Sequence, residues 1–367
     1  MIQEQELLSL MMLQNLSGIG QINAKKLLEH FGSATRLFEA SERELSFIDG
    51  IGRKRLQSLK DALDLKSAEE ELKFIEKNNI RVLHYKDEEY PSRLKQCIDS
   101  PILLFSRGNI NLKHKPILSI VGTRQITSHG IAFCEELIKD MAPLDPVIVS
   151  GLAYGTDIIA HKAAMDNGLQ TIACLAHGLN QIYPKVHQKY VSAIEQHGGF
   201  FTDFCSYDKF DRKNFLSRNR IVAGLSEATV VIESAEKGGS LVTADIAHSY
   251  NREVFAVPGR SHDKFSKGCN MLIKQQKAQM ITSAADLIYF LNWDIETQKE
   301  HQQTQLFHDL TPEEKLVFDI LKEVGKAEID TLSLKCNLPT HKLASILIQL
   351  ELNGCVRPLP GKQFEII

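Results

Sequence analysis

The chain has 367 residues, of which 43% are hydrophobic and 24% are charged, and its formal net charge at pH 7 is −3. This length predicts two or three domains, and the slight negative charge argues against a protein that coats duplex DNA through bulk positive charge, so any nucleic-acid site must be local. The sequence contains no apolar run of membrane-spanning length, no recognisable signal peptide and no Cys-x-x-Cys pair among its seven cysteines, which favours a cytoplasmic protein with no membrane association, zinc site or disulfide framework.

Residues 1–65 are expected to form a helical domain with an internal repeat. Leu-Ser-Gly-Ile-Gly at 16–20 recurs as Ile-Asp-Gly-Ile-Gly at 48–52, and each copy joins an apolar helix pattern to a helix that begins with basic residues. This arrangement resembles tandem helix-hairpin-helix motifs, whose glycine turn presents backbone amides to a DNA phosphate. A small helical bundle that binds no ligand is the alternative, and we slightly favour it.

Residues 66–291 alternate between strand and helix patterns. Short, β-branched apolar segments predict strands at 117–121, 146–149, 171–175, 200–203, 228–232, 254–257 and 279–281. Amphipathic stretches between them predict helices at 131–141, 157–167, 185–196 and 241–251. This alternation predicts an α/β fold, a Rossmann-like and mostly parallel sheet with helices on both faces. Such sheets bind ligands at the carboxyl ends of their strands.

The first strong strand is followed by Gly122, Thr123 and Arg124. The glycine permits a close backbone approach, and the other two side chains supply a hydroxyl and a guanidinium group for a phosphate. The segment is neither a Walker loop nor Gly-x-Gly-x-x-Gly, so no nucleotide cofactor is indicated. Downstream, Asp157 and His161 have the spacing of one helix face, and we favour a structural hydrogen bond for this pair over a general base.

Two further segments suit helix starts that hold an anion. We expect Ser217 to cap one helix, with Arg218 and Arg220 in its first turn, and the Gly238-Gly239-Ser240 turn to open another. Cations in a first helical turn oppose the helix dipole, and a phosphate bound there would reverse that cost.

The segment 207–220 combines basic residues with Tyr207, Phe210 and Phe215. Aromatic rings beside cations suit stacked single-stranded bases, whereas a solvated charged loop is the ordinary alternative. On this segment alone the two interpretations are evenly balanced.

The polar, glutamine-rich residues 292–310 are expected to form a flexible linker before a winged helix at 311–367. A capping box begins at Thr311, helices are expected at 328–335 and 340–352, and a β pair follows. Because the second of these helices offers only His341 and Lys342 as cations, we expect a protein contact or an accessory role there.

Together these segments resemble the DNA-processing protein A (DprA/Smf) family over nearly the whole chain. The resemblance is carried by Val-Gly-Thr-Arg at 121–124, Ser-Gly-Leu-Ala-Tyr-Gly-Thr-Asp at 150–157, His-Gly-Leu-Asn-Gln-Ile-Tyr-Pro-Lys at 177–185, Arg-Asn-Arg-Ile-Val-Ala-Gly-Leu-Ser at 218–226, Gly-Gly-Ser-Leu-Val-Thr-Ala at 238–244 and Ala-Val-Pro-Gly at 256–259. It implies a non-enzymatic protein that binds single-stranded DNA, protects incoming DNA and loads the RecA recombinase during natural transformation.

The resemblance also implies roles for individual residues. Arg124 and Lys185 would be the principal phosphate contacts, with Arg218, Asn219 and Arg220 on the same pocket wall. The family further implies a homodimer, for which Met271 and Met280 are the candidate contacts. The chain departs from the family pattern at Thr156, at Asn180, at Gly238-Gly239 and in the segment 202–216, where the family's proline-containing pieces are missing.

The runner-up is a Rossmann-like enzyme of the nucleoside monophosphate hydrolase type. Such enzymes depend on a Pro-Gly-Gly-x-Gly-Thr-x-x-Glu loop with a catalytic glutamate. The comparable segment here reads Glu-Lys-Gly-Gly-Ser-Leu-Val-Thr-Ala at 236–244 and lacks that acid. A pure scaffold protein is the third alternative, which the clustered cations disfavour.

Overall fold

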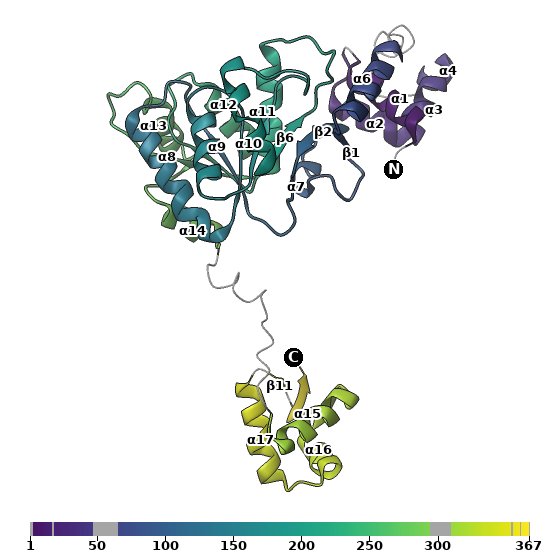
Figure 1. Ribbon diagram of the computed structural model, residues 1–367, viewed down its shortest axis with the longest axis vertical. Helices are drawn as coiled ribbons and strands as arrows, with labels where there is room; N and C mark the ends of the chain where they lie inside the picture. The colour runs from purple at the N-terminus through teal and green to yellow at the C-terminus, as the bar shows by residue number, and fades with distance from the viewer. Residues whose placement is uncertain are drawn as a thin grey trace. The chain divides into compact units, whose positions relative to one another are not determined.

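The computed structural model describes residues 3–16, 18–46, 65–293, 310–353, 355–359 and 361–366. The chain divides into two compact units, residues 1–295 and 296–367 (Figure 1). The second predicted glycine hairpin at 48–52 and most of the predicted linker lie outside the described residues. Within the described parts, none of the helices is both long enough and apolar enough to cross a membrane.

The N-terminal helices pack into one bundle. They are α1 (Glu4–Gln14), α2 (Gln21–Phe31), α3 (Ala34–Glu39), α4 (Glu42–Ser46) and α6 (Leu65–Lys77). The turn between α1 and α2 contains Gly18, whose positive φ of 83° is a conformation that glycine adopts without strain. The buried side chains of this bundle continue into the sheet, because Leu13 of α1 and Ile75 of α6 belong to the same hydrophobic cluster as Phe105 and Phe200.

A nine-stranded sheet, ordered β1-β2-β6-β5-β4-β3-β7-β8-β9, forms the centre of the first unit. Its strands are β1 (Arg81–His84), β2 (Leu103–Gly108), β3 (Ile117–Val121), β4 (Val147–Ser150), β5 (Thr171–Cys174), β6 (Gly198–Thr202), β7 (Ala228–Val231), β8 (Glu253–Ala256) and β9 (Gln279–Met280). The seven strands from β3 to β9 run parallel to one another, as predicted. The strands β1 and β2 were not predicted; they pair antiparallel with each other, and β2 also pairs antiparallel with β6.

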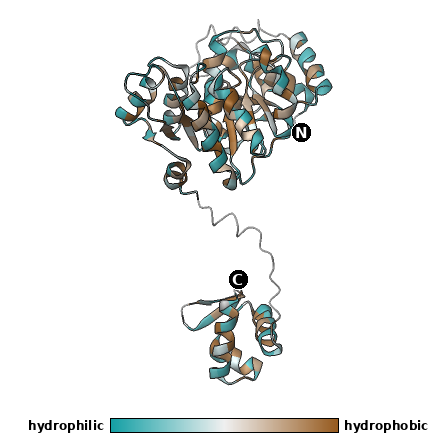
Figure 2. Cartoon of the chain, turned by 60° about the vertical axis from the view of Figure 1, so that its left-hand side comes forward, coloured by the Kyte–Doolittle hydropathy of each residue, from teal (hydrophilic) through white to brown (hydrophobic). Residues whose placement is uncertain are grey.

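Helices cover both faces of the sheet, because alternate strand residues point to opposite sides. The helices are α7 (Ser92–Lys95), α8 (Ser128–Met141), η1 (Ala142–Leu144), α9 (Thr156–Asp166), η2 (Lys185–Tyr190), α10 (Val191–Gln196), α11 (Lys213–Leu225), α12 (Gly239–Ser249), α13 (Lys267–Lys274) and α14 (Ala284–Leu291). Val149 and Val231 pack in one cluster with side chains of α11 and α12, while Ile148 and Val230 pack in another with side chains of α8, α9 and α14. Figure 2 shows the hydrophobic strands enclosed by these helices.

The second unit has the helices and β wing that the sequence predicts, with one additional strand. Its elements are α15 (Pro312–Val324), β10 (Lys326–Glu328), α16 (Ile329–Cys336), α17 (Thr340–Leu352), β11 (Val356–Leu359) and β12 (Gln363–Ile366). The predicted capping box at Thr311 and Glu314 is confirmed. The strands form an antiparallel sheet ordered β10-β12-β11, so the predicted fold class is confirmed for both units.

Candidate nucleic-acid interface

A cleft with a volume of about 540 Å³ lies at the carboxyl ends of β3 and β7. The strands β4, β5 and β6 follow one another on one side of β3 in the sheet, and the next strand in the chain, β7, pairs with the opposite side of β3. This reversal of strand order is where open α/β sheets bind ligands. Eight of the predicted DNA-binding residues line this cleft: Gly122, Thr123, Arg124, Arg218, Asn219, Gly238, Gly239 and Ser240.

The loop after β3 is held tightly against the start of α9. The backbone oxygen of Thr123 accepts hydrogen bonds from the Thr156 amide at 3.1 Å and from its hydroxyl at 3.2 Å. A Cβ atom at Gly122 would lie 2.3 Å from the Thr156 hydroxyl oxygen, so this close approach requires glycine. The loop leaves the Arg124 side chain exposed, with its guanidinium carbon 5.6 Å from the centre of the Phe215 ring.

The predicted helix start at Gly238-Gly239-Ser240 is confirmed, because α12 begins at Gly239. The first turn of α12 contains no acidic residue, and a Cβ atom at Gly239 would meet no described heavy atom within 4 Å. The Ser240 hydroxyl donates a hydrogen bond to the Ser234 hydroxyl at 2.9 Å. The free amides and positive dipole end of α12 therefore open into the cleft, which is an arrangement that favours an anion.

The predicted start of the preceding helix is wrong. Ser217 lies inside α11, which begins four residues earlier at Lys213. The Asp211 carboxylate accepts a hydrogen bond from the Lys213 amide at 2.9 Å, and this local turn begins the helix. As a result, Arg218 and Arg220 lie in the helix interior rather than in its first turn, and both are buried.

Arg218 is buried and lines the cleft. Its guanidinium donates to the backbone oxygen of Cys174, and a side chain at Gly151 would collide with its terminal nitrogens. Burial lowers the pKa of Arg218, and the nearby Asp157 carboxylate partly offsets this effect. Among the described residues the Nε atom of Arg218 has no hydrogen-bond partner. Arg218 is thus a fixed cation beneath the cleft.

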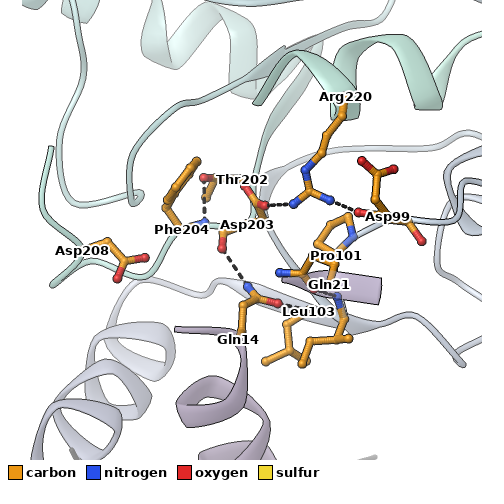
Figure 3. A network of polar contacts seen from close by, with 12 residues as sticks. Gln14, Gln21, Asp99, Pro101, Leu103, Thr202, Asp203, Phe204, Asp208 and Arg220 are labelled. Carbon is orange, nitrogen blue, oxygen red and sulfur yellow. Dashed lines mark hydrogen bonds and ion pairs between the residues drawn. The ribbon is translucent and has the colours of Figure 1, made fainter. Parts of the chain in front are cut away.

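Arg220 points away from the cleft, contrary to the prediction that it shares one wall with Arg124. Its guanidinium forms an ion pair with Asp203 and donates to the backbone oxygen of Asp99 (Figure 3). The Asp99 carboxylate in turn accepts from the Tyr250 hydroxyl. Because these groups occupy its donors, Arg220 braces the core and is removed from the candidate DNA contacts.

Three aromatic rings form the mouth of the cleft, and we call Tyr183, Phe210 and Phe215 the aromatic cluster. The Tyr183 and Phe210 ring centres are 4.9 Å apart, and Phe215 lies 5.8 Å from the first and 5.7 Å from the second. The side chains of Tyr183 and Phe210 are each 44% exposed. Tyr207, which the sequence groups with these rings, instead accepts a hydrogen bond from Asn15 at 2.7 Å and faces the helical region.

The remaining predicted residues lie outside the cleft. Lys185 is exposed and borders a neighbouring hollow together with Tyr183 and Phe210, so the aromatic cluster separates it from Arg124. Met271 is half-buried and packs against the core, whereas Met280 is 53% exposed on β9 at the edge of the sheet.

One cation and two polar side chains of the cleft were not predicted as DNA-binding residues. Arg212 is exposed and lines the cleft, although the sequence names it only as part of a charged run. Ser234 and Thr243 also line the cleft, and no charge or aromatic ring marks them in the sequence.

The residues that suggested acid–base chemistry are structural. The His161 ring is buried and hydrogen-bonded to the Thr171 hydroxyl at 2.7 Å and to the backbone oxygen of Gly151 at 2.6 Å. Burial lowers the pKa of His161, which favours its neutral form. His161 is therefore structural, as expected, but its hydrogen bonds go to Thr171 and Gly151 rather than to Asp157, whose carboxylate accepts from the Ala153 amide at 3.2 Å. Among the described residues, no group of three His, Cys, Asp or Glu side chains is arranged to hold a metal ion.

Three family models match this chain. They are DNA recombination-mediator protein A over residues 81–292, the DprA winged helix domain over 302–362, and the SAM-like helix-hairpin-helix tandem over 10–65. Protein Smf of Escherichia coli is 32% identical over 300 residues, which cover 81% of this chain and 80% of that protein.

The solved structures that are similar to this chain include two with 30% sequence identity. The X-ray structure of DNA processing protein A from Streptococcus pneumoniae has a TM-score of 0.67 and covers 78% of this chain and 98% of its own. The structure of the Helicobacter pylori protein of the same name, described for its single-stranded DNA binding mode, has a TM-score of 0.52 and covers 58% of this chain and 95% of its own.

Proposed function

Because the chain belongs to the DNA recombination-mediator protein A family, we propose that it binds single-stranded DNA in the cleft between Arg124 and the start of α12. One observation carries this proposal: a helix N-terminus, two exposed arginines and an exposed aromatic cluster converge on one cleft of a chain with a net charge of −3. The single-stranded DNA binding described for the Helicobacter pylori relative supports it.

The geometry suggests how a strand would lie. One phosphate would accept hydrogen bonds from the Gly239 and Ser240 amides and from the Arg124 guanidinium, while Arg218 adds positive potential from below. The neighbouring bases would stack on Tyr183 and Phe210, which suits the unpaired bases of a single strand because the bases of a duplex are already stacked on one another. Lys185, beyond the aromatic cluster, would take a later phosphate.

We further propose that the protein protects incoming DNA and loads the RecA recombinase on it, acting as a binding protein and not as an enzyme. A homodimer would present two clefts to one strand. The sheet ends at the short strand β9, and Met280 of β9 and Tyr289 and Phe290 of α14 are exposed hydrophobic side chains near this edge. Light scattering at tens of micromolar, suited to a roughly micromolar dissociation constant, tests the dimer. A monomeric mass would refute it, whereas charged residues at Met271 and Met280 should give a folded monomer.

The direct test is titration of a labelled single-stranded oligonucleotide and of its duplex across a salt series. We expect tighter binding of the single strand, and an affinity that falls as salt rises because phosphate contacts release counterions. Equal or tighter binding of the duplex would refute the proposal. Incubation with nucleoside monophosphates tests the enzymatic alternative, which the release of free base would support.

A further inference from the structure

The segment from Asp203 to Arg212, which we call the cleft loop, joins β6 to α11 and carries two residues of the proposed DNA site. Phe210 contributes the central ring of the aromatic cluster, and Arg212 lines the cleft. The loop packs closely over Gly178, where a Cβ atom would lie 2.4 Å from the backbone oxygen of Cys205. The position of Phe210 therefore depends on what holds the first half of this loop.

Side chains at the end of α1 hold the loop from the helical region. The Gln14 side-chain amide donates to the backbone oxygen of Asp203 at 2.7 Å and accepts from the Leu103 amide at 2.8 Å (Figure 3). The next residue, Asn15, donates to the Cys205 sulfur at 3.2 Å and to the Tyr207 hydroxyl at 2.7 Å. The bonds from Gln14 and Asn15 to the loop join residues that are about half the chain apart in sequence, and they hold the end of α1 against the loop.

Glu71 of α6 also contacts the loop, through a buried carboxylate. Its side chain is 3% exposed, and its carboxylate accepts from the Ser206 amide at 2.8 Å and from the Ser206 hydroxyl. Among the described residues, both hydrogen bonds of this carboxylate come from Ser206. A buried carboxylate without hydrogen bonds is costly, so movement of Ser206 away from Glu71 is opposed by the loss of both bonds. Bonds to a charged acceptor are also stronger than neutral ones.

We propose that Glu71 and Asn15 are positioning residues for the DNA cleft, which hold the cleft loop so that Phe210 stays beside Tyr183 and Phe215. The helical region then governs single-strand affinity without touching the strand. This inference rests on the proposed function of the cleft. The competing explanation is that these contacts join the helical region to the core and leave the second half of the loop unaffected.

The first test measures the loop without DNA. Hydrogen exchange of amides in 204–212 should become faster in Glu71→Ala than in wild type, with unchanged exchange in β3 and β7. Glu70→Ala is the matched control, because Glu70 is the exposed neighbour on α6. Glu71→Gln should restore slow exchange, because its amide oxygen still accepts from Ser206. Unchanged loop exchange in Glu71→Ala would overturn the proposal.

The second test measures single-strand affinity. Glu71→Ala should weaken binding about five-fold or more, and Glu70→Ala less than about two-fold. In a Phe210→Ala background, Glu71→Ala should have little further effect, because both changes act through the same ring. Full additivity of the two changes would overturn the proposal. Should Glu71→Ala fail to fold, Ser206→Ala and Asn15→Ala provide the same comparison with smaller losses.

The outcomes separate the two proposals. A wild-type protein that does not bind single-stranded DNA would refute the proposed function, and the positioning role would fall with it. A wild type that binds, together with a folded Glu71→Ala variant of equal affinity, would refute the positioning role alone.

Discussion

The helices α12 and α2 each begin after a glycine turn, and the surroundings of the two turns differ. At the start of α12, Gly238 and Gly239 open into the cleft, beside Arg124 and Arg212. At the start of α2, Gly18 and Gly20 form the first hairpin of the helix-hairpin-helix tandem. Both turns expose helix amides of the kind that bind phosphate, so local geometry alone does not distinguish them.

The charges around the two turns do distinguish them. Leu16 and the residues from Ile19 to Asn23 line a hollow of about 840 Å³. Three aspartates, Asp99, Asp203 and Asp208, and two cations, Lys209 and Arg220, line it as well, and we call it the acidic hollow. Lys25, a basic residue of this hairpin, donates to the Ser100 hydroxyl at 2.5 Å and to two backbone oxygens. A phosphate at this turn would meet carboxylates and a lysine that is already occupied. We therefore expect the first hairpin to serve as a docking element, and we expect the start of α12 to be the better suited of the two to bind DNA.

The largest expected effect comes from removing cations beside the cleft. Arg124→Ala combined with Lys185→Ala should weaken single-strand binding on the order of 100-fold, since each charge-assisted contact contributes about 1.5 kcal/mol. The salt dependence should also flatten. Lys26→Ala, an exposed residue of the α2 hairpin, is the matched control and should change affinity less than two-fold (roughly). Equal losses in the two proteins would show that the hairpin binds DNA as well.

The acidic hollow should affect stability through Asp208. Burial raises the pKa of Asp208 to about 6, and the carboxylates of Asp203 and Glu71 add to this, although a hydrogen bond from the Cys205 amide opposes it. A carboxyl whose pKa is higher in the folded state than its ordinary 3.8 stabilises the fold below that value, and this contribution is lost as the pH rises to about 6.

Asp208→Asn should therefore raise the free energy of unfolding by about 1–2 kcal/mol at pH 7 and have little effect at pH 3.5 (roughly). Urea denaturation of both proteins at several pH values measures this difference. Asp263→Asn, at an exposed position, is the control. A difference that does not grow with pH would contradict the partly buried environment of Asp208 beside other carboxylates.

Gly239→Asp should separate helix stability from DNA binding. A carboxylate in the first turn of α12 favours the helix dipole and should stabilise the protein by about 0.5 kcal/mol. The same charge should repel phosphate and weaken single-strand binding by about 1 kcal/mol, or five-fold. Gly239→Asn, which has the same shape without the charge, should lose much less affinity. Thermal melting and titration measure the two effects, and loss of affinity in both variants would indicate a steric cause.

The smallest effect is expected from the second unit. Its helix α17 places His341 and Lys342 near its start, and Lys342 already pairs with Glu313. Truncation after Trp293 should leave single-strand affinity within a few-fold, less than about 1 kcal/mol. Titration of truncated and full-length proteins at one salt concentration tests this, and a ten-fold loss (about 1.4 kcal/mol) would show that the second unit belongs to the binding site.

Repetitive local patterns made most of the fold predictable. The parallel strands β3, β4 and β7 are rich in β-branched residues and buried throughout, so they stand out in the sequence, as do the capping box at Thr311 and the glycine turn of α12. The antiparallel strands β1 and β2 were missed. The strand β1 is short and only partly buried, whereas β2 has six residues of which the first four are buried. The ion pair of Arg220 was not predictable from the residues next to it in the sequence. Its partner Asp203 follows β6, whereas Arg220 lies in α11, and only the folded chain brings the two together.

The hydrophobic cluster that α1 and α6 share with β2 and β6 has a consequence for how the protein unfolds. The helical region is a separate module in the sequence, yet removing it would take away part of the hydrophobic cluster that contains Phe105 and Phe200 and lose part of its burial energy. Residues 3–293 should accordingly melt in one cooperative transition instead of two. An N-terminal deletion would then cause aggregation through a bare sheet face, so a lost activity in such a protein would not identify a DNA contact.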